Sequence, residues 1–194
     1  MRYGRNFIQW LKMENPAPYV GNTNDSAIRV SPVGWLFDSL ERTRQVARNS
    51  AEVSHNTAEG IRGAESVASA IFLARQGKSK DYIKVYIESS LGYDLSCRLD
   101  DIRPSYNLFF ECDKSVPEAI IAFLESKDFE DSIRNAVSLG GDSDTLAAIA
   151  GSIAEAFYGV PQDLIAKIEQ IIPTDMLNVI RDFNVLLDER RSQK

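Results

Sequence analysis

Histidine and cysteine are scarce in this chain of 194 residues, which contains one His and two Cys. The single His, His55, excludes zinc sites built from several His and the His-Glu-x-x-His pattern of metalloproteases. Cys97 and Cys112 are too few for a disulfide framework and lack the spacing of a metal site, so we expect a reducing cytoplasm. Any metal ion in this protein must therefore be held mostly by oxygen.

The chain also lacks an excess of positive charge and a long apolar run. Its 22 Lys and Arg against 28 Asp and Glu give a formal net charge of -6. This balance argues against nucleic acid or an anionic membrane as a partner, because such binding relies on clustered basic side chains. No apolar stretch approaches the roughly 20 residues needed to span a bilayer, and the residues from Met1 to Trp10 lack the apolar core of a secretory signal. We therefore expect a cytoplasmic protein with no membrane partner.

Apolar side chains recur at helical spacing through most of the chain. The striped segments begin near Trp35, Ile61, Ile83, Pro117, Phe129, Asp142, Pro161 and Met176. No segment shows the sustained apolar/polar alternation of a hairpin. The pattern predicts an all-α, compact helical bundle that forms a single domain over residues 1–194. Two longer segments, 15–32 and 99–116, break the pattern with Pro, Gly and Asn and are expected to be irregular.

One helix start combines tight-turn residues with oxygen donors. Residues 140–145 read Gly-Gly-Asp-Ser-Asp-Thr, and the helix that follows carries small residues on one side, namely Ala147, Ala148, Ala150, Gly151 and Ala154. Oxygen side chains in a first helical turn suit hard cations such as Mg²⁺ and Mn²⁺, and the helix dipole favours ionised carboxylates there. A simpler alternative is that Asp142 caps the helix while Asp144 complements its dipole.

Three segments together resemble the ADP-ribosylglycohydrolase family, which includes the dinitrogenase reductase-activating glycohydrolases and the J1-crystallins. Residues 140–145 resemble the family's C-terminal metal motif. Residues 26–34, Ser-Ala-Ile-Arg-Val-Ser-Pro-Val-Gly, are similar to its Ser-Ala-Met-Arg-Val-Ser-Pro-Val-Gly segment. His55, followed by Glu59, Gly60 and Gly63, resembles its His-bearing helix start. The three segments occur in the order that the family has.

The resemblance implies an all-α fold with a binuclear Mg²⁺ or Mn²⁺ site. Such a site would hydrolyse the N- or O-glycosidic bond of ADP-ribose in an ADP-ribosylated protein or a small ADP-ribosyl compound. Asp142, Asp144 and Thr145 match the family's metal ligands. The implied substrate-side residues are Asn24, Ser26, His55 and Ser143.

Two departures from the family pattern shape the functional expectation. No segment matches the family's N-terminal Thr-Asp-Asp-Thr/Ser metal motif, so we expect the C-terminal two-thirds of an N-terminally truncated family fold, with half the metal ligands. Thr23 and Asp25 also stand where the family has glycines. We therefore expect hydrolysis to be impaired in this chain alone, and either a complementing N-terminal fragment or a homodimer as partner. The alternative is an inactive family member that acts as a binding or structural protein, like the crystallins.

Several single residues keep more than one interpretation. His55 is either a buried ring donating to a backbone carbonyl at a helix start, a nucleotide-side residue, or a general base for a serine nucleophile. Tyr93 and Tyr106 belong either to the core or beside an adenine ring.

Overall fold

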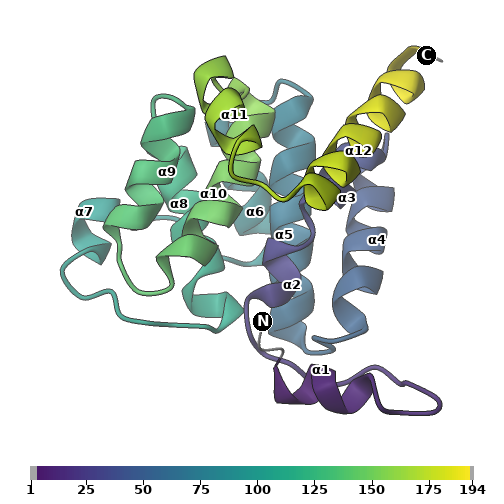
Figure 1. The fold of residues 1–194 in the computed structure, drawn as a ribbon. Helices are drawn as coiled ribbons and strands as arrows, with labels where there is room; N and C mark the ends of the chain where they lie inside the picture. The colour runs from purple at the N-terminus through teal and green to yellow at the C-terminus, as the bar shows by residue number, and fades with distance from the viewer. Residues whose placement is uncertain (1–3, 193–194) are drawn as a thin grey trace. The chain divides into compact units, whose positions relative to one another are not determined.

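The computed structural model describes residues 4–192, and these residues form helices with no β-strand among them (Figure 1). Within residues 4–192, Thr23 and Glu111 form an isolated antiparallel bridge. The prediction of an all-α fold is confirmed. The chain groups into two compact units, one up to Tyr158 and one from Gly159. A single domain over residues 1–194 stays a prediction.

The first unit contains most of the helices. They are α1 (Arg5–Trp10), α2 (Asp25–Ile28), α3 (Ser31–Leu36), α4 (Leu40–Glu52), α5 (Ala58–Arg75), α6 (Lys80–Leu91), α7 (Leu99–Ile102), a short 3₁₀ helix η1 (Cys112–Lys114), α8 (Val116–Leu124), α9 (Phe129–Ser138) and α10 (Ser143–Tyr158).

Helix α5 lies at the centre of the first unit, where it contacts α2, α3, α4, α6, α8 and α10 (Figure 1). Its sequence is rich in Gly, Ala and Ser, and the segment from Gly63 to Ala74 is buried throughout. Small residues let neighbours approach closely: a Cβ added at Gly63 would lie 2.8 Å from the sulfur of Cys112. The small-residue composition therefore allows one helix to be surrounded on nearly all sides.

Side-chain caps fix where the longer helices begin. Ser39 accepts from the N–H of Arg42 (3.2 Å), and Thr57 accepts from the N–H of Gly60 (3.0 Å). The cap at Ser39 explains a difference from the sequence expectation, because the single stripe predicted from Trp35 onward is two helices, α3 and α4. Phe37 adopts an extended conformation between them.

The two segments expected to be irregular contain short helices. α2 and the start of α3 lie within residues 15–32, and α7 and η1 lie within residues 99–116. Helices of three to six residues are marginal on their own, and packing on α5 and α8 supports them. Their apolar stripes are too short to be detected from periodicity.

The second unit consists of α11 (Gln162–Glu169) and α12 (Thr174–Ser192). Pro161 precedes α11, and its carbonyl accepts from the N–H groups of Leu164 and Ile165. An ion pair of 3.8 Å joins Arg181 to Glu169. Among residues 4–192, no helix combines the length and the apolar character that crossing a membrane requires.

A lysine closes one end of the first unit. The Lys80 ammonium lies 5.2 Å from the ring centre of Phe123 and 5.3 Å from that of Tyr158, and it donates to the carbonyls of Leu124 (3.1 Å) and Ser126. These carbonyls lie at the last residue of α8 and just beyond it, where backbone acceptors have no helical partner. Lys80 therefore ties the start of α6 to the end of α8 and to the aromatic end of α10.

Replacing Lys80 with methionine is expected to lower the free energy of unfolding by about 2 kcal/mol, because charge-assisted hydrogen bonds and cation–π contacts are lost together. Urea unfolding followed by circular dichroism measures the change. Lys84→Met on the same helix is the control, since both variants remove one positive charge. Equal stability of the two variants would contradict the role assigned to Lys80.

Candidate functional site

Two glycines in the left-handed conformation begin the acidic segment before α10. Gly140 has φ +77° and Gly141 has φ +61°. A Cβ at Gly141 would lie 2.6 Å from the carbonyl oxygen of Asn107, so this backbone passes directly against the loop that follows α7. The Asp142 carbonyl then accepts the first helical hydrogen bond from the N–H of Leu146 (3.1 Å). The turn aims the next three oxygen side chains toward one helix end.

The helix start carries an acidic cluster, defined as Asp142, Asp144 and Thr145, whose members differ in solvent exposure. Asp142 is half-buried, Asp144 is exposed and Thr145 is buried. Asp144 accepts from the backbone N–H of Thr145 at 3.0 Å. Ser143 is half-buried and is the first residue of α10. Three oxygen donors therefore gather in the first turn of a helix whose dipole favours negative charge.

Asn24 joins the loop before α2 to this cluster. Its side-chain nitrogen donates to the Asp142 carboxylate at 3.0 Å and to the Ser115 hydroxyl at 3.2 Å, and its own side chain is 3% exposed. The Asn24 backbone N–H also donates to the carbonyl of Phe110 (2.7 Å). The structure thus brings together two of the residues selected from the sequence, which are 118 positions apart.

Ser26 points away from the surface. Its hydroxyl donates to the carbonyl of Gly60 at 2.8 Å, and the side chain is 0% exposed. This contact fastens α2 onto the first turn of α5. Ser26 therefore fixes the position of the loop that carries Asn24, and its hydroxyl does not reach the surface.

His55 is buried in a cluster of hydroxyls with one carboxylate. Its Nε2 lies 2.8 Å from Thr23 Oγ1 and 3.5 Å from Asp25 Oδ2, and its Nδ1 lies 2.8 Å from Ser54 Oγ. Because Thr23 donates its proton to Asp25, its oxygen is left to accept from Nε2–H of His55. Both ring nitrogens thus have side-chain partners, one in the segment at the start of α2 and one in the loop after α4.

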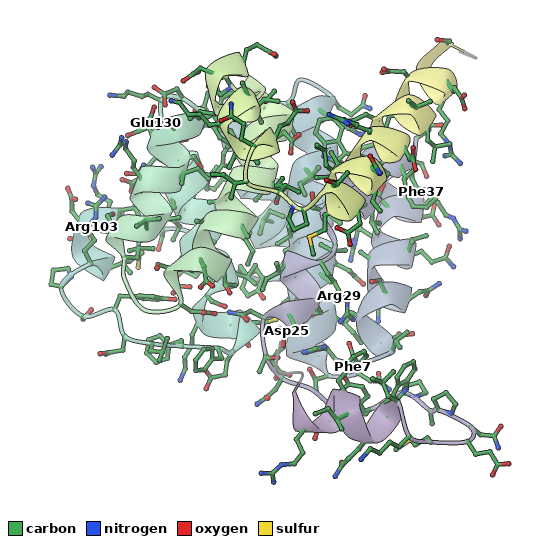
Figure 2. All side chains as sticks on the ribbon, in the orientation of Figure 1. Phe7, Asp25, Arg29, Phe37, Arg103 and Glu130 are labelled. Carbon is green, nitrogen blue, oxygen red and sulfur yellow. The ribbon has the colours of Figure 1, made fainter. Side chains whose placement is uncertain are left out.

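Asp25 carries a negative charge at the edge of the site. It is the first residue of α2 (Figure 2). Its side chain is 65% exposed. Hydrogen bonding to His55, followed by that to Thr23, lowers the pKa of Asp25 from 3.8 to about 2, although partial burial opposes the shift. Asp25 is therefore ionised throughout the neutral range.

Cys112 and Tyr106 border the same region as neutral groups. Burial raises the pKa of the Cys112 thiol to about 11, and the thiol donates to the carbonyl of Thr23 (3.3 Å). Burial, with the charges of Glu118 and Asp142, raises the pKa of Tyr106, whose hydroxyl donates to the Lys114 carbonyl (2.9 Å). Neither group is an ionised nucleophile at neutral pH.

The sequence did not single out Ser115, whose hydroxyl accepts a hydrogen bond from the same Asn24 amide that donates to Asp142. A serine directly before the Val-Pro start of α8 is a weak signal, because serine is common at helix starts for capping alone. The two tyrosines considered from the sequence lie in different places. Tyr93 is buried, and the Arg62 guanidinium lies 4.8 Å from the centre of the Tyr93 ring. Tyr106 lies against Gly141.

The acidic cluster suits one side of a metal coordination shell. Carboxylate and hydroxyl oxygens are the donors that Mg²⁺ and Mn²⁺ prefer, and the Asn24 amide engages one oxygen of Asp142, Oδ2. Across residues 4–192, however, no three His, Cys, Asp or Glu side chains gather closely enough to hold a metal ion. The oxygen donors of the acidic cluster therefore fit a hard cation, but they are too few to complete its coordination shell.

Comparison with known proteins places these features in context. Residues 2–194 match the model of the family described as ADP-ribosylglycohydrolase. Human ADP-ribosylhydrolase ARH3 is 28% identical over 186 residues, covering 72% of this chain and 51% of that protein. The ADP-ribosylarginine hydrolase Tri1 of Pseudomonas putida is 28% identical over 159 residues, covering 75% of this chain and 42% of that protein. This chain thus spans about half the length of these relatives.

A solved structure agrees with the sequence relatives. An "ADP-ribosylglycohydrolase-related protein complex" superposes with a TM-score of 0.65 at 25% identity, covering 81% of this chain and 59% of that one. The similarity therefore extends from the sequence to the arrangement of the helices.

Alanine substitutions at Gly140 and Gly141 are expected to show how much stability each glycine contributes through its positive φ and how much through close packing. Gly140→Ala should cost about 1 kcal/mol of unfolding free energy through its positive φ alone, because a Cβ there meets nothing within 4 Å. Gly141→Ala should cost about 2–3 kcal/mol, since its Cβ also meets a backbone oxygen. Urea unfolding of both variants is the measurement, and equal losses would argue against the contact with Asn107.

The low pKa of Asp25 predicts a specific dependence on pH. A carboxyl whose folded pKa is depressed stabilises the fold above its unfolded pKa of 3.8, and this contribution is lost as pH falls through about 2. Because Asp25 is largely exposed, the expected contribution is below about 1 kcal/mol. An NMR titration of the Asp25 carboxyl carbon should show a midpoint near 2. His55→Leu should raise it more than Thr23→Val, and the opposite order would refute the assignment.

Proposed function

We propose a hydrolase function from one premise: the chain belongs to the ADP-ribosylglycohydrolase family. The proposed reaction is Mg²⁺- or Mn²⁺-dependent hydrolysis of the glycosidic bond in an ADP-ribosylated protein or a small ADP-ribosyl compound. The observation that carries the proposal is the hydrogen bond between Asn24 and Asp142, which joins the loop expected beside the substrate to the cluster expected to hold the metal.

The proposed metal ligands in this chain are Asp142, Asp144 and Thr145. The Asn24 amide engages one oxygen of Asp142 and so orients the other, as groups behind a ligand commonly do. A bound divalent cation would supply Lewis acidity and an activated water. Ser143, half-buried within the same turn, would lie beside the reacting bond.

Substrate contact is proposed for the surface edge of the loop around Asn24. Asp25 is ionised and exposed there, so it disfavours a neighbouring diphosphate and accepts hydrogen bonds from sugar hydroxyls. His55 holds Asp25 and Thr23 in place from behind. Ser26 contributes by anchoring α2 to α5. In this proposal His55 and Ser26 are positioning residues for the substrate loop.

We further propose that hydrolysis is weak in this chain alone. Three protein oxygens seldom hold Mg²⁺ firmly without substrate phosphates or further ligands. A complementing N-terminal fragment or a second copy of the chain would supply the remaining donors. The competing function, a binding or structural protein without activity, is favoured by the small number of carboxylates in the cluster.

Metal titration of single variants tests the cluster directly. Calorimetry with Mn²⁺ should detect weak binding to the full chain, and Asp142→Asn or Asp144→Asn should abolish it. Asn24→Ala should weaken it about 10–100-fold, as for groups that orient a metal ligand. Asp81→Asn is the matched control, because Asp81 also lies in a first helical turn, on α6. Unchanged Mn²⁺ binding in Asp142→Asn and Asp144→Asn would overturn the metal assignment.

Activity is tested by complementation. Release of ADP-ribose from an ADP-ribosylated protein is measured with the chain alone, and then with an added N-terminal half of a relative such as human ADP-ribosylhydrolase ARH3. The expected result is little release alone and Mg²⁺-dependent release on addition, lost again in Asp144→Asn. A chain that binds no Mn²⁺ and gains no activity would support the structural alternative.

A further inference from the structure

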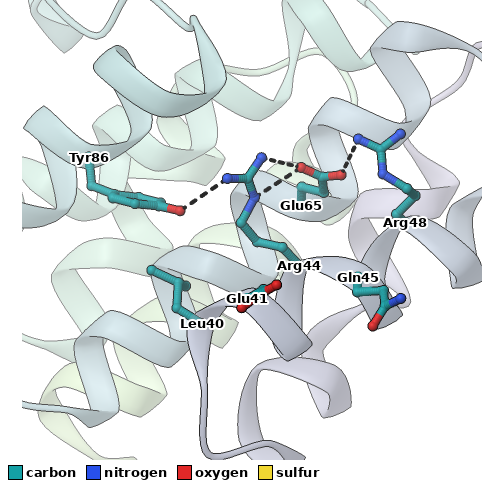
Figure 3. Close-up of a pocket in the computed structure, with 7 residues that line it drawn as sticks. All are labelled: Leu40, Glu41, Arg44, Gln45, Arg48, Glu65 and Tyr86. Carbon is teal, nitrogen blue, oxygen red and sulfur yellow. Dashed lines mark hydrogen bonds and ion pairs between the residues drawn. The ribbon is translucent and has the colours of Figure 1, made fainter.

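A buried carboxylate shared by two arginines lies between α4, α5 and α6, away from the acidic cluster. Glu65 of α5 is 3% exposed. Arg44 donates to one of its oxygens through Nε (3.1 Å) and Nη2 (2.7 Å), and Arg48 donates to the other through Nη2 (2.7 Å). Figure 3 shows the two guanidinium groups approaching Glu65 from opposite sides. Both carboxylate oxygens are therefore satisfied.

The charges in this cluster do not cancel. Two guanidinium groups and one carboxylate leave one uncompensated positive charge, in a chain whose formal net charge is -6. Arg48 directs one donor to Glu65, and its side chain is 49% exposed, so other donors of its planar fork remain accessible. Arg44 places its third nitrogen 3.4 Å from the Tyr86 hydroxyl.

A hollow of ≈ 290 Å³, here called the arginine groove, runs beside these residues. Arg44, Arg48 and Arg62 line it with a single carboxylate, Glu65, and it shares no residue with the proposed metal and substrate site. Arg62 is also paired with Asp113. A neighbouring hollow of ≈ 370 Å³ includes Glu41 (Figure 3), which makes that side less positive.

The groove also receives the start of the longest helix of the first unit. Ala58, the first residue of α5, lines it together with Ser90 of α6. Ser90 is exposed and offers a hydroxyl. The positive dipole end of α5 is offset there by Glu59 in its own first turn and by the C-terminal turn of α6, so the arginines supply the positive charge of the groove. Guanidinium forks and a hydroxyl in one hollow are features that bind oxyanions.

We infer that the arginine groove binds a phosphate group carried by a small molecule. The phosphate oxygens would accept from the donors of Arg48 that do not face Glu65 and from Ser90, while Arg44 and Arg62, each paired with a carboxylate, line the same hollow. Glu65 holds the guanidinium planes in fixed orientations, so the donors are ordered before the ligand arrives. This inference is independent of the hydrolase proposal, because the two sites share no side chain.

Phosphate titration of the full chain tests the inference. Inorganic phosphate is added at constant ionic strength while amide NMR shifts are recorded, with chloride as the reference salt. Saturable shifts are expected around Arg48, Ala58 and Ser90. Arg48→Gln should weaken binding about 10-fold, the effect of losing one charge-assisted hydrogen bond. Arg134→Gln, which removes the same charge from an exposed pair on α9, should leave it unchanged.

A second pair of variants leaves the buried ion pairs untouched. Ser90→Asp places a carboxylate in the groove and should abolish the saturable shifts. Ser89→Asp adds the same charge one residue away, outside the groove lining, and should retain binding. Absence of saturable shifts in the wild-type chain, shifts confined to the start of α10, or equal binding by Ser90→Asp and Ser89→Asp would each overturn the inference.

Discussion

The near-complete burial of α5 is the constraint on which the first unit depends. A helix with neighbours on almost every side must carry small residues, and these must fall where each neighbour approaches. Gly60 and Gly63 meet His55 and Cys112 in this way, and the Gly60 carbonyl receives Ser26. The register of α5 therefore sets the position of the loop beside the acidic cluster. The same register places Glu65 beneath the two arginines of α4.

Glu65 and Asp142 are carboxylates with opposite kinds of neighbour: charged guanidinium groups surround Glu65, whereas a neutral amide contacts Asp142. Glu65 is buried and surrounded by guanidinium groups, so its charge is compensated within the chain. Asp142 receives an amide N–H from Asn24, and this neutral contact orients the carboxylate without neutralising it. A compensated carboxylate organises its partners, whereas an uncompensated one is available to a cation. The first unit thus keeps the arginines around Glu65 apart from the carboxylates of the acidic cluster.

Much of the helical architecture could be predicted from the sequence, because apolar periodicity and local caps act over a few residues. Gly140 and Gly141 before two Asp also identified a helix start with oxygen donors, as the structure has it. The break between α3 and α4 was missed, since their apolar residues continue one stripe across Phe37. The short helices α2 and α7 were missed because packing, rather than local sequence, supports them.

Side-chain directions within the candidate site were harder to predict than its members. Nothing local distinguishes a serine that faces solvent from one that bonds a helix carbonyl, and Ser26 does the latter. The partners of His55 depend on Thr23 and Asp25, more than 25 positions earlier in the chain. The contact between Ser115 and Asn24 likewise joins separate segments. Such long-range pairings follow from the packed fold, which sequence periodicity does not specify.

The separation of 118 residues between Asn24 and Asp142 has a consequence for folding kinetics. Closing a loop of this length costs entropy that is recovered only when the intervening helices have packed. Neighbouring pairs such as α4 with α5 and α9 with α10 need only short loops, so we expect them to form early. On the ribosome, the Asn24 amide would lack its Asp142 partner until the start of α10 has emerged. The oriented Asp142 carboxylate is thus a late product of folding, completed together with the first unit.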